Sequence, residues 1–346
     1  MDAPGLRYLE IINIRLKMEK VLIRGVNWIG DAVMGMPFIS GLGRAWPDAE
    51  IHVLTRPHII DLYKYNPYVK SVISVNEKSK ILGWKAAIRK TKEMKFNMAI
   101  CLPHSFSSAL FLFFSGIEKR YGRACSGRSM LFTHPVYGKI KEYAAHQSDF
   151  YLEMLEAISG YRTADRLPEI HISDYERQKA SAILEQSKPP VLGIFCSAAY
   201  GPAKVWPRES FAELGRQYIL ATGGSVILFG GASDYSANNA IAVSIGNSAL
   251  NIAGATNLLE SVAVMEKCNV IVANDSGPMH LAAASGTKTV GIFGSTNPAR
   301  TAPLGRNATY ITKSLACAPC MARVCRLGTY ECLKSITPED ILKEIL

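Results

Sequence analysis

The chain alternates short apolar runs with longer amphipathic stretches, and this alternation limits its fold more than any other feature. Short apolar runs are typical of buried strands, whereas longer stretches with helical periodicity are typical of helices. Their alternation indicates βαβ units, which build parallel sheets covered by helices. The expected strands are 21–24, 51–54, 72–75, 98–102, 191–195, 225–229, 270–273 and 289–293. The expected helices are 37–45, 82–94, 106–114, 147–159, 174–186, 208–221, 235–245, 258–267, 278–284 and 338–345.

The alternation of apolar runs and amphipathic stretches is interrupted once, between about residues 162 and 190. This stretch ends in Lys188-Pro189-Pro190. A length of 346 residues suits two domains of roughly 100–200 residues each. We therefore expect an α/β protein with two tandem Rossmann-like, doubly wound domains, 1–173 and 174–346, facing a cleft. In such sheets ligands bind at the carboxyl ends of the strands, so the loops that follow strands should carry the chemistry.

The positive charge is concentrated in the first half. The chain has 39 Lys and Arg against 29 Asp and Glu, a net charge of +10. Residues 1–173 hold 24 against 16, or +8, and residues 174–346 hold 15 against 13, or +2. The first half therefore favours an anionic partner, such as nucleic acid, an anionic membrane surface or a phosphorylated acceptor, unless the charge only aids solubility. No aromatic-interleaved basic motif or zinc-finger spacing supports nucleic acid, and we expect none to bind.

No segment is expected to span a membrane. The most apolar window, 99–117, contains Pro103, His104 and four serines, and suits a buried strand followed by a helix. Residues 1–17 carry charges throughout and lack a small-residue cleavage site, so they do not resemble a signal peptide. This extension is either a peripheral helix or the product of an early start codon. The cytosol is the expected compartment.

Three loops that follow expected strands carry polar residues suited to group-transfer chemistry. In the loop 24–31, Asp31 is either a helix N-cap or a general base. In the loop 196–207, Ser197 could donate to a phosphate, and Lys204 is either a solvated lysine or a group that neutralises a leaving diphosphate.

The third loop, 273–280, opens the helix expected at 278–284. Ser276 and Gly277 would let a phosphate approach the helix N-terminus, unless the loop is only an Asx turn with a cap. His280 either contacts phosphate or sugar, or is packed. Asp234 follows another strand and could bond ribose hydroxyls.

Cysteines cluster near the C-terminus. Cys317, Cys320, Cys325 and Cys332 have the spacing C-x₂-C-x₄-C-x₆-C. A single C-x₂-C pair leaves two interpretations open, a structural zinc site or free thiols. Neither makes these cysteines catalytic.

From about residue 20 onward the chain resembles the ADP-heptose:lipopolysaccharide heptosyltransferases, most closely their type II members. The resemblance is carried by residues 27–31 (NWIGD), 200–207 (YGPAKVWP) and 274–280 (NDSGPMH), with support from 105–123. It implies a GT-B fold and an inverting transfer of heptose that needs no metal or other cofactor. It also implies ADP-heptose as donor, and as acceptor the phosphorylated, heptosylated Kdo₂–lipid A core, reached as a peripheral enzyme on the inner face of the cytoplasmic membrane.

The resemblance also implies roles for particular residues. Asp31 matches the catalytic base, Lys204 the lysine beside the donor phosphates, and Asp275 the aspartate near the donor sugar. The expected donor-binding residues are Ser197, Lys204, Asp234, Asp275, Ser276, Gly277 and His280, and the expected acceptor-side residues are Asn27, Gly30 and Ser105. The chain departs from its relatives at 104–107, where it reads HSFS and they often read NSFR.

Two other functions stay open at this point. The chain could transfer heptose at another core position, as type I or later-acting enzymes do. It could also be a nucleotide-binding relative without transferase activity, although the presence of both Asp31 and Lys204 favours an enzyme.

Overall fold

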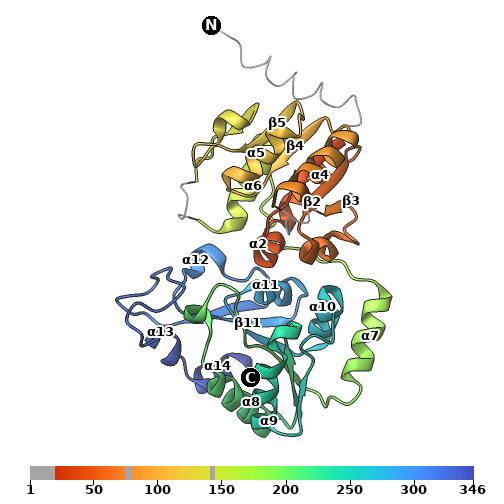
Figure 1. Ribbon diagram of the computed structural model, residues 1–346. Helices are drawn as coiled ribbons and strands as arrows, with labels where there is room; N and C mark the ends of the chain where they lie inside the picture. The colour runs from red at the N-terminus through yellow and green to blue at the C-terminus, as the bar shows by residue number, and fades with distance from the viewer. Residues whose placement is uncertain (1–19, 75–79, 141–144) are drawn as a thin grey trace. The chain divides into compact units, whose positions relative to one another are not determined.

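The computed structural model describes residues 20–74, 80–140 and 145–346, and these form two compact units (Figure 1). Of the described residues, the first unit comprises 20–27, 35–74, 80–140 and 148–166, and the second comprises 28–34, 145–147 and 167–346. The last change of unit along the chain lies between residues 166 and 167, whereas the sequence predicted a single boundary after 173. Segment 28–34 belongs to the second unit, however, which the sequence did not indicate. The interpretation of residues 1–17 lies outside the described residues.

The first unit is built on a six-stranded parallel sheet with the order β3-β2-β1-β4-β5-β6. Its strands are β1 (Lys20–Arg24), β2 (Glu50–Thr55), β3 (Val69–Ser74), β4 (Met98–Cys101), β5 (Lys119–Arg123) and β6 (His134–Val136). Its helices are α3 (Met36–Ala45), α4 (Lys80–Glu93), α5 (Phe106–Phe114) and α6 (Gln147–Ser159), and short 3₁₀ turns include η2 (Pro57–Tyr63) and η3 (Ser129–Leu131). Strands β1 and β4 are buried along almost their whole length, as parallel strands covered on both faces require.

The second unit repeats this topology with the order β12-β11-β10-β7-β8-β9. Its strands are β7 (Val191–Phe195), β8 (Ser225–Phe229), β9 (Ala249–Asn251), β10 (Val270–Asn274), β11 (Lys288–Phe293) and β12 (Ala308–Thr312). Its helices are α2 (Ile29–Met34), α7 (Asp174–Leu184), α8 (Arg208–Thr222), α9 (Tyr235–Ile245), α10 (Leu258–Lys267), α11 (Gly277–Ala284), α12 (Pro298–Thr301), α13 (Glu331–Lys334) and α14 (Pro338–Ile345), with the turns η4 (Pro202–Lys204) and η5 (Ala232–Asp234).

In both units the strand order reverses beside the first strand, between β1 and β4 and between β7 and β10. The crevice at such a reversal, at the carboxyl ends of the strands, is where doubly wound sheets bind ligands. The expectation of two Rossmann-like units is confirmed. No helix among the described residues is long and apolar enough to cross a membrane.

The expectation that Asp31 lies on a loop is wrong, because Asp31 lies in the first turn of α2. Pro37 does interrupt the helical path: α2 ends at Met34, and α3 begins at Met36 with Pro37 in its first turn. The isolated turn-and-a-half of α2 is too short to show helical periodicity in the sequence.

Candidate functional site

The loops of the second unit converge because β7, β10 and β11 are neighbours in the sheet. Lys204 lies on η4 in the loop after β7, Asp275 follows β10 directly, and Thr296 lies in the loop after β11. Since parallel strands end at the same edge of a sheet, these loops share one edge. The sequence expectation that these loops share an edge is therefore confirmed for this unit.

A buried ion pair lies at the centre of this edge. The Lys204 Nζ atom is 2.6 Å from Asp275 Oδ2, and the two side chains are only 13% and 3% exposed. The Thr296 hydroxyl donates a hydrogen bond of 2.5 Å to the same Asp275 oxygen. The interpretation of Lys204 as a freely solvated lysine is therefore wrong, because Asp275 fixes its ammonium group inside the site.

The C-terminal segment holds the loop that carries Lys204. The Ala203 N–H donates to the Arg323 carbonyl oxygen at 3.1 Å, and the Tyr200 hydroxyl donates to the Met321 carbonyl oxygen at 2.7 Å. Gly201 has a φ of +148°, and a Cβ atom there would lie 2.6 Å from the Arg323 carbonyl oxygen. Only glycine therefore fits this close approach, which sets the position of η4.

The N-terminus of α11 presents unused hydrogen-bond donors. Ser276 is the N-cap of α11, yet its side chain makes no capping bond. Its hydroxyl and that of Ser295 are buried without a hydrogen-bond partner in the described part of the chain. Together with the positive end of the α11 helix dipole, these hydroxyls form a site suited to an anion. A simple capped turn would have used the Ser276 hydroxyl, so the geometry favours the anion-binding interpretation.

Helix α2 brings Asp31 to this unit by packing closely against α11. A Cβ atom on Gly30 would lie 2.8 Å from His280 Cδ2, and one on Gly277 would lie 2.9 Å from Ile29 Cβ. The two glycines thus permit the contact between the helices. Gly30 thus packs against His280 within the second unit, and its expected role on the acceptor side stays a prediction.

The pKa of the Asp31 carboxyl group is shifted towards neutral pH. Burial raises its pKa to about 6, while the positive charges of Lys204 and then Arg300 act in the opposite direction. A carboxylate with such a pKa is ionised at pH 7 and still basic enough to accept a proton. The sequence indicated Asp31 but not Arg300, whose place in α12 has no distinctive local pattern.

His280 is buried in α11, and burial lowers its pKa to about 4. Asp275 raises this pKa, whereas His146 and Lys204 lower it further. The imidazole is therefore neutral at pH 7, so it does not offer a positive charge to a phosphate. Its ring packs beside Gly30, as the packed alternative predicted.

Asp234 and Ser197 are the two other residues expected to bind the donor. One Asp234 carboxylate oxygen accepts a 2.9 Å hydrogen bond from the Gly231 N–H and so closes its own turn, η5. Ser197 is partly buried in the loop after β7. The roles of both residues toward a nucleotide stay predictions.

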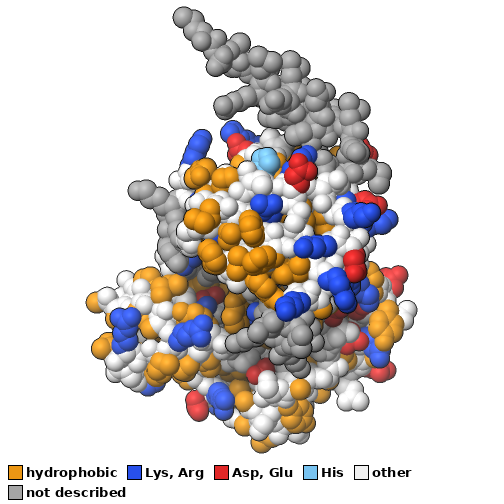
Figure 2. All heavy atoms as spheres, turned by 45° about the horizontal axis from the view of Figure 1, so that its top comes forward, with side chains coloured by type: hydrophobic (Ala, Val, Ile, Leu, Met, Phe, Trp, Pro, Cys, Tyr) orange, Lys and Arg blue, Asp and Glu red, His pale blue; other side chains and the backbone are white. Residues whose placement is uncertain are grey.

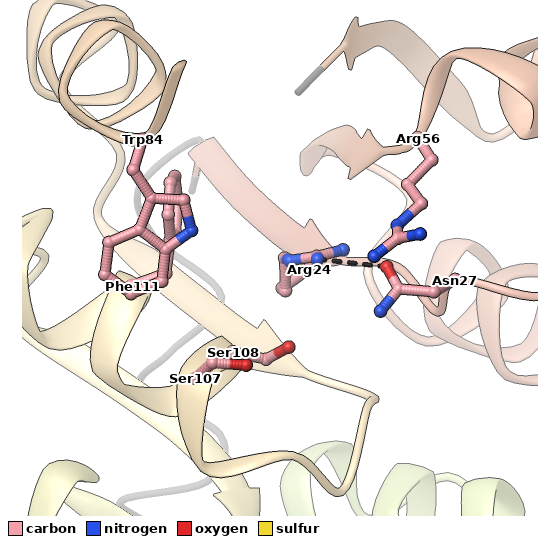
Figure 3. Close-up of a pocket in the computed structure, with 7 residues that line it drawn as sticks. All are labelled: Arg24, Asn27, Arg56, Trp84, Ser107, Ser108 and Phe111. Atoms are coloured by element: carbon pink, nitrogen blue, oxygen red, sulfur yellow. Dashed lines mark hydrogen bonds between the residues drawn. The ribbon is translucent and has the colours of Figure 1, made fainter. Parts of the chain in front are cut away.

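The first unit contains a basic pocket at the equivalent edge of its own sheet (Figure 3). Its lining consists of Arg24, Asn27, Arg56, Trp84, Ser107, Ser108 and Phe111. Arg24 ends β1, and its Nη2 atom donates a 3.1 Å hydrogen bond to Asn27 Oδ1. None of the described lining residues is acidic, so two guanidinium groups give the pocket a positive potential.

Helix α5 forms the opposite wall of this pocket. Ser105 is its N-cap and accepts a 3.3 Å hydrogen bond from the Ser108 N–H. Ser107 lines the pocket on this wall, and Arg24 and Arg56 supply positive charge from the other side. Sequence reasoning missed both arginines, although each stands at the end of a strand: Arg24 ends β1 and Arg56 follows β2.

The C-terminal cysteines lie close enough for Cys317, Cys320 and Cys325 to affect the charge state of Cys332. None of these four described residues forms a disulfide bond, and the Cys325 pKa is lowered by backbone N–H groups, foremost that of Tyr330. Among the described residues no group of three or more His, Cys, Asp or Glu side chains is arranged to hold a metal ion. Both interpretations of this cluster, a structural zinc site and free thiols, stay predictions.

Comparisons with known proteins agree with this description. Residues 84–331 match the family model of glycosyltransferase family 9 (heptosyltransferase). The chain is 30% identical to lipopolysaccharide heptosyltransferase 2 of Escherichia coli K12, over 94% of this chain and 97% of that protein. The crystal structure of E. coli ADP-heptose LPS heptosyltransferase II has a TM-score of 0.79 at 29% identity and covers 94% of this chain and 97% of its own.

A family 9 glycosyltransferase from Veillonella parvula superposes with a TM-score of 0.85 at 22% identity, covering 95% of this chain and 96% of its own. At that identity the likeness concerns the fold alone. Both solved structures are glycosyltransferases of the same two-domain class, which confirms the expected GT-B fold.

Proposed function

The chain belongs to glycosyltransferase family 9, the heptosyltransferases, and on this premise we propose that it transfers L-glycero-D-manno-heptose from ADP-heptose to the heptosylated inner core of lipopolysaccharide. The proposal includes a peripheral position on the cytoplasmic face of the membrane, where a lipid-anchored acceptor would be met. The observation that carries it is the assembly of Asp31, Lys204 and the open N-terminus of α11 at one sheet edge.

The part of this proposal that concerns ADP-heptose rests on the positive charge of the site. As the bond between the heptose and the diphosphate breaks, negative charge develops on the departing ADP. Lys204 and the positive end of the α11 helix dipole would stabilise that charge, and the Ser276 and Ser295 hydroxyls would donate to phosphate oxygens. The positive charge of Lys204 thus stabilises the departing ADP.

The transfer itself needs a base. Asp31, ionised at pH 7, would take the proton from the acceptor hydroxyl as that oxygen attacks the anomeric carbon from the side opposite the departing diphosphate. Attack from the opposite side inverts the anomeric configuration. The protonated carboxyl then returns its proton to solvent after the product leaves.

The direct test supplies purified protein with ADP-heptose and two defined acceptors, Kdo₂–lipid A with and without its first heptose. We expect a heptosylated product, identified by mass spectrometry, only from the acceptor that already carries one heptose. Turnover on the heptose-free acceptor alone would assign a type I activity. ADP binding without turnover on either acceptor would favour the non-catalytic alternative.

We further propose that the basic pocket of Arg24 and Arg56 binds an anionic group of the acceptor, either a phosphate or a carboxylate. Replacing Arg56 by methionine should raise the KM for the acceptor roughly 10- to 100-fold, because one charge-assisted hydrogen bond is worth about 1.5–3 kcal/mol. The kcat and the Kd for ADP should change little.

The matched control is Arg162→Met, which removes an exposed arginine of the same unit that pairs with Glu156 at 2.6 Å. This control should leave the acceptor KM unchanged. An unaltered KM in Arg56→Met would remove the pocket from the acceptor site, without affecting the assignment of the transfer reaction.

A further inference from the structure

Helix α5 is apolar on both of its faces, which is unusual for a helix at the surface. Its nine residues, FSSALFLFF, carry no charge. Ala109, Phe111 and Leu112 are buried in the core of the first unit. Phe106, Phe113 and Phe114 lie on the outer side and are 49%, 44% and 50% exposed.

A neighbouring turn extends this apolar surface. Met130 lies in η3, which packs against α5, and its side chain is 81% exposed. We call the outer residues of α5 together with Met130 the α5 patch. Figure 2 shows hydrophobic side chains gathered on an exposed face of the first unit, with Lys and Arg side chains around them. Monomeric proteins rarely leave such surface open without a partner.

Basic side chains border the α5 patch. The Arg120 guanidinium lies 5.5 Å from the centre of the Phe113 ring, and Lys92 lies beside Gly116, directly after α5. Helix α4, whose Trp84 ring packs on Phe111 of α5, carries exposed basic residues at 85, 89, 90 and 92. An apolar centre with a basic border matches the surface of an anionic bilayer, where aromatic rings enter the interface and cations meet the headgroups.

We infer that the α5 patch docks the enzyme on an anionic lipid bilayer. A second copy of the chain is a poorer occupant, because a self-complementary contact would bring the basic borders of both copies together. The inference rests on the proposed function and deepens it. Ser107 and Ser108 of the same helix line the basic pocket, so docking would hold that pocket near the surface in which the acceptor is anchored.

The test measures co-sedimentation of the full chain with vesicles of phosphatidylcholine, with and without phosphatidylglycerol. We expect binding that requires phosphatidylglycerol and weakens as salt rises. The double variant Phe113→Ser/Phe114→Ser should lower the partition coefficient at least tenfold. The matched control, Leu220→Ser/Val243→Ser, removes apolar side chains of the second unit that are 88% and 75% exposed, and should bind as the unmodified chain does.

A second variant keeps the test decisive if the double serine variant does not fold. Lys90→Glu/Lys92→Glu reverses charge at the border of the α5 patch and should also weaken binding to phosphatidylglycerol. Equal vesicle binding by the unmodified chain and the folded variants would overturn the inference. A dimer that the phenylalanine variant separates, as measured by light scattering, would also overturn it.

Turnover on a deacylated, water-soluble acceptor separates this inference from the proposed function. The phenylalanine variant should retain that turnover. If the unmodified chain transfers heptose to the soluble acceptor but does not bind vesicles, only the docking inference fails. If it transfers no heptose to any acceptor, the proposed function fails.

Discussion

Replacing Asp31 by asparagine should reduce kcat by roughly 10²- to 10⁴-fold, because the amide cannot accept the proton of the attacking hydroxyl. The Kd for ADP should stay nearly the same, since in our proposal Lys204 and the N-terminus of α11 bind the diphosphate. The measurement combines steady-state kinetics with calorimetric titration of ADP. Asp48→Asn, which changes an exposed carboxylate of the first unit, is the matched control and should keep full activity.

The pH profile gives an independent check of the same role. Since Asp31 acts as a base only when ionised, kcat/KM should rise with pH through a pKa of about 6 and level off above it. A profile that stays flat between pH 5 and 7, or full turnover in Asp31→Asn, would show that another group takes the proton.

Asp31 should also reduce stability at neutral pH. Its pKa is about 6 in the folded chain and near 3.8 in the unfolded chain, so the folded state binds more protons between these values. The contribution of Asp31 to the free energy of unfolding therefore falls as pH rises from about 4 to about 6 and stays low above that range. The Tm of Asp31→Asn at pH 7 should accordingly be equal to or above that of the unmodified chain.

The sequence predicted the central strands and most of the long helices because each has a clear apolar pattern. It did not predict β5, whose sequence KRYGR has no apolar run, or the strands β6, β9 and β12 at the sheet edges. Such strands form because a neighbouring strand offers hydrogen bonds, and Gly122 in β5 gives space to the Phe132 ring. Tertiary context of this kind leaves no periodic signal in the chain.

The candidate site was also predictable from the sequence only in part. Loops after strong strands pointed to Lys204, Asp275 and Ser276, because doubly wound sheets bind ligands at the carboxyl ends of their strands. The packing of α2 on α11 depends on two distant glycines, Gly30 and Gly277, and could not be read from either segment alone. The contribution of Arg300 to the pKa of Asp31 likewise becomes visible only when separate segments of the chain are placed together in the fold.

Replacing Lys204 by methionine should affect both turnover and stability, and the two effects can be separated. Loss of the cation opposite the departing diphosphate should reduce kcat by about 10²- to 10³-fold. The same change leaves the Asp275 carboxylate, only 3% exposed, without its partner. Removing one member of a buried ion pair typically lowers the free energy of unfolding by about 3–5 kcal/mol.

The double variant Lys204→Met/Asp275→Asn distinguishes catalysis from support of the fold. Removing both charges relieves the unpaired carboxylate, so urea unfolding should show most of the lost stability restored. Turnover should stay low, because the amide of asparagine brings no positive charge to the leaving group. If turnover recovers together with stability, Lys204 acts only by holding Asp275 in place, and the cation that supports the departing ADP must come from another residue, of which Arg300 is the first to test.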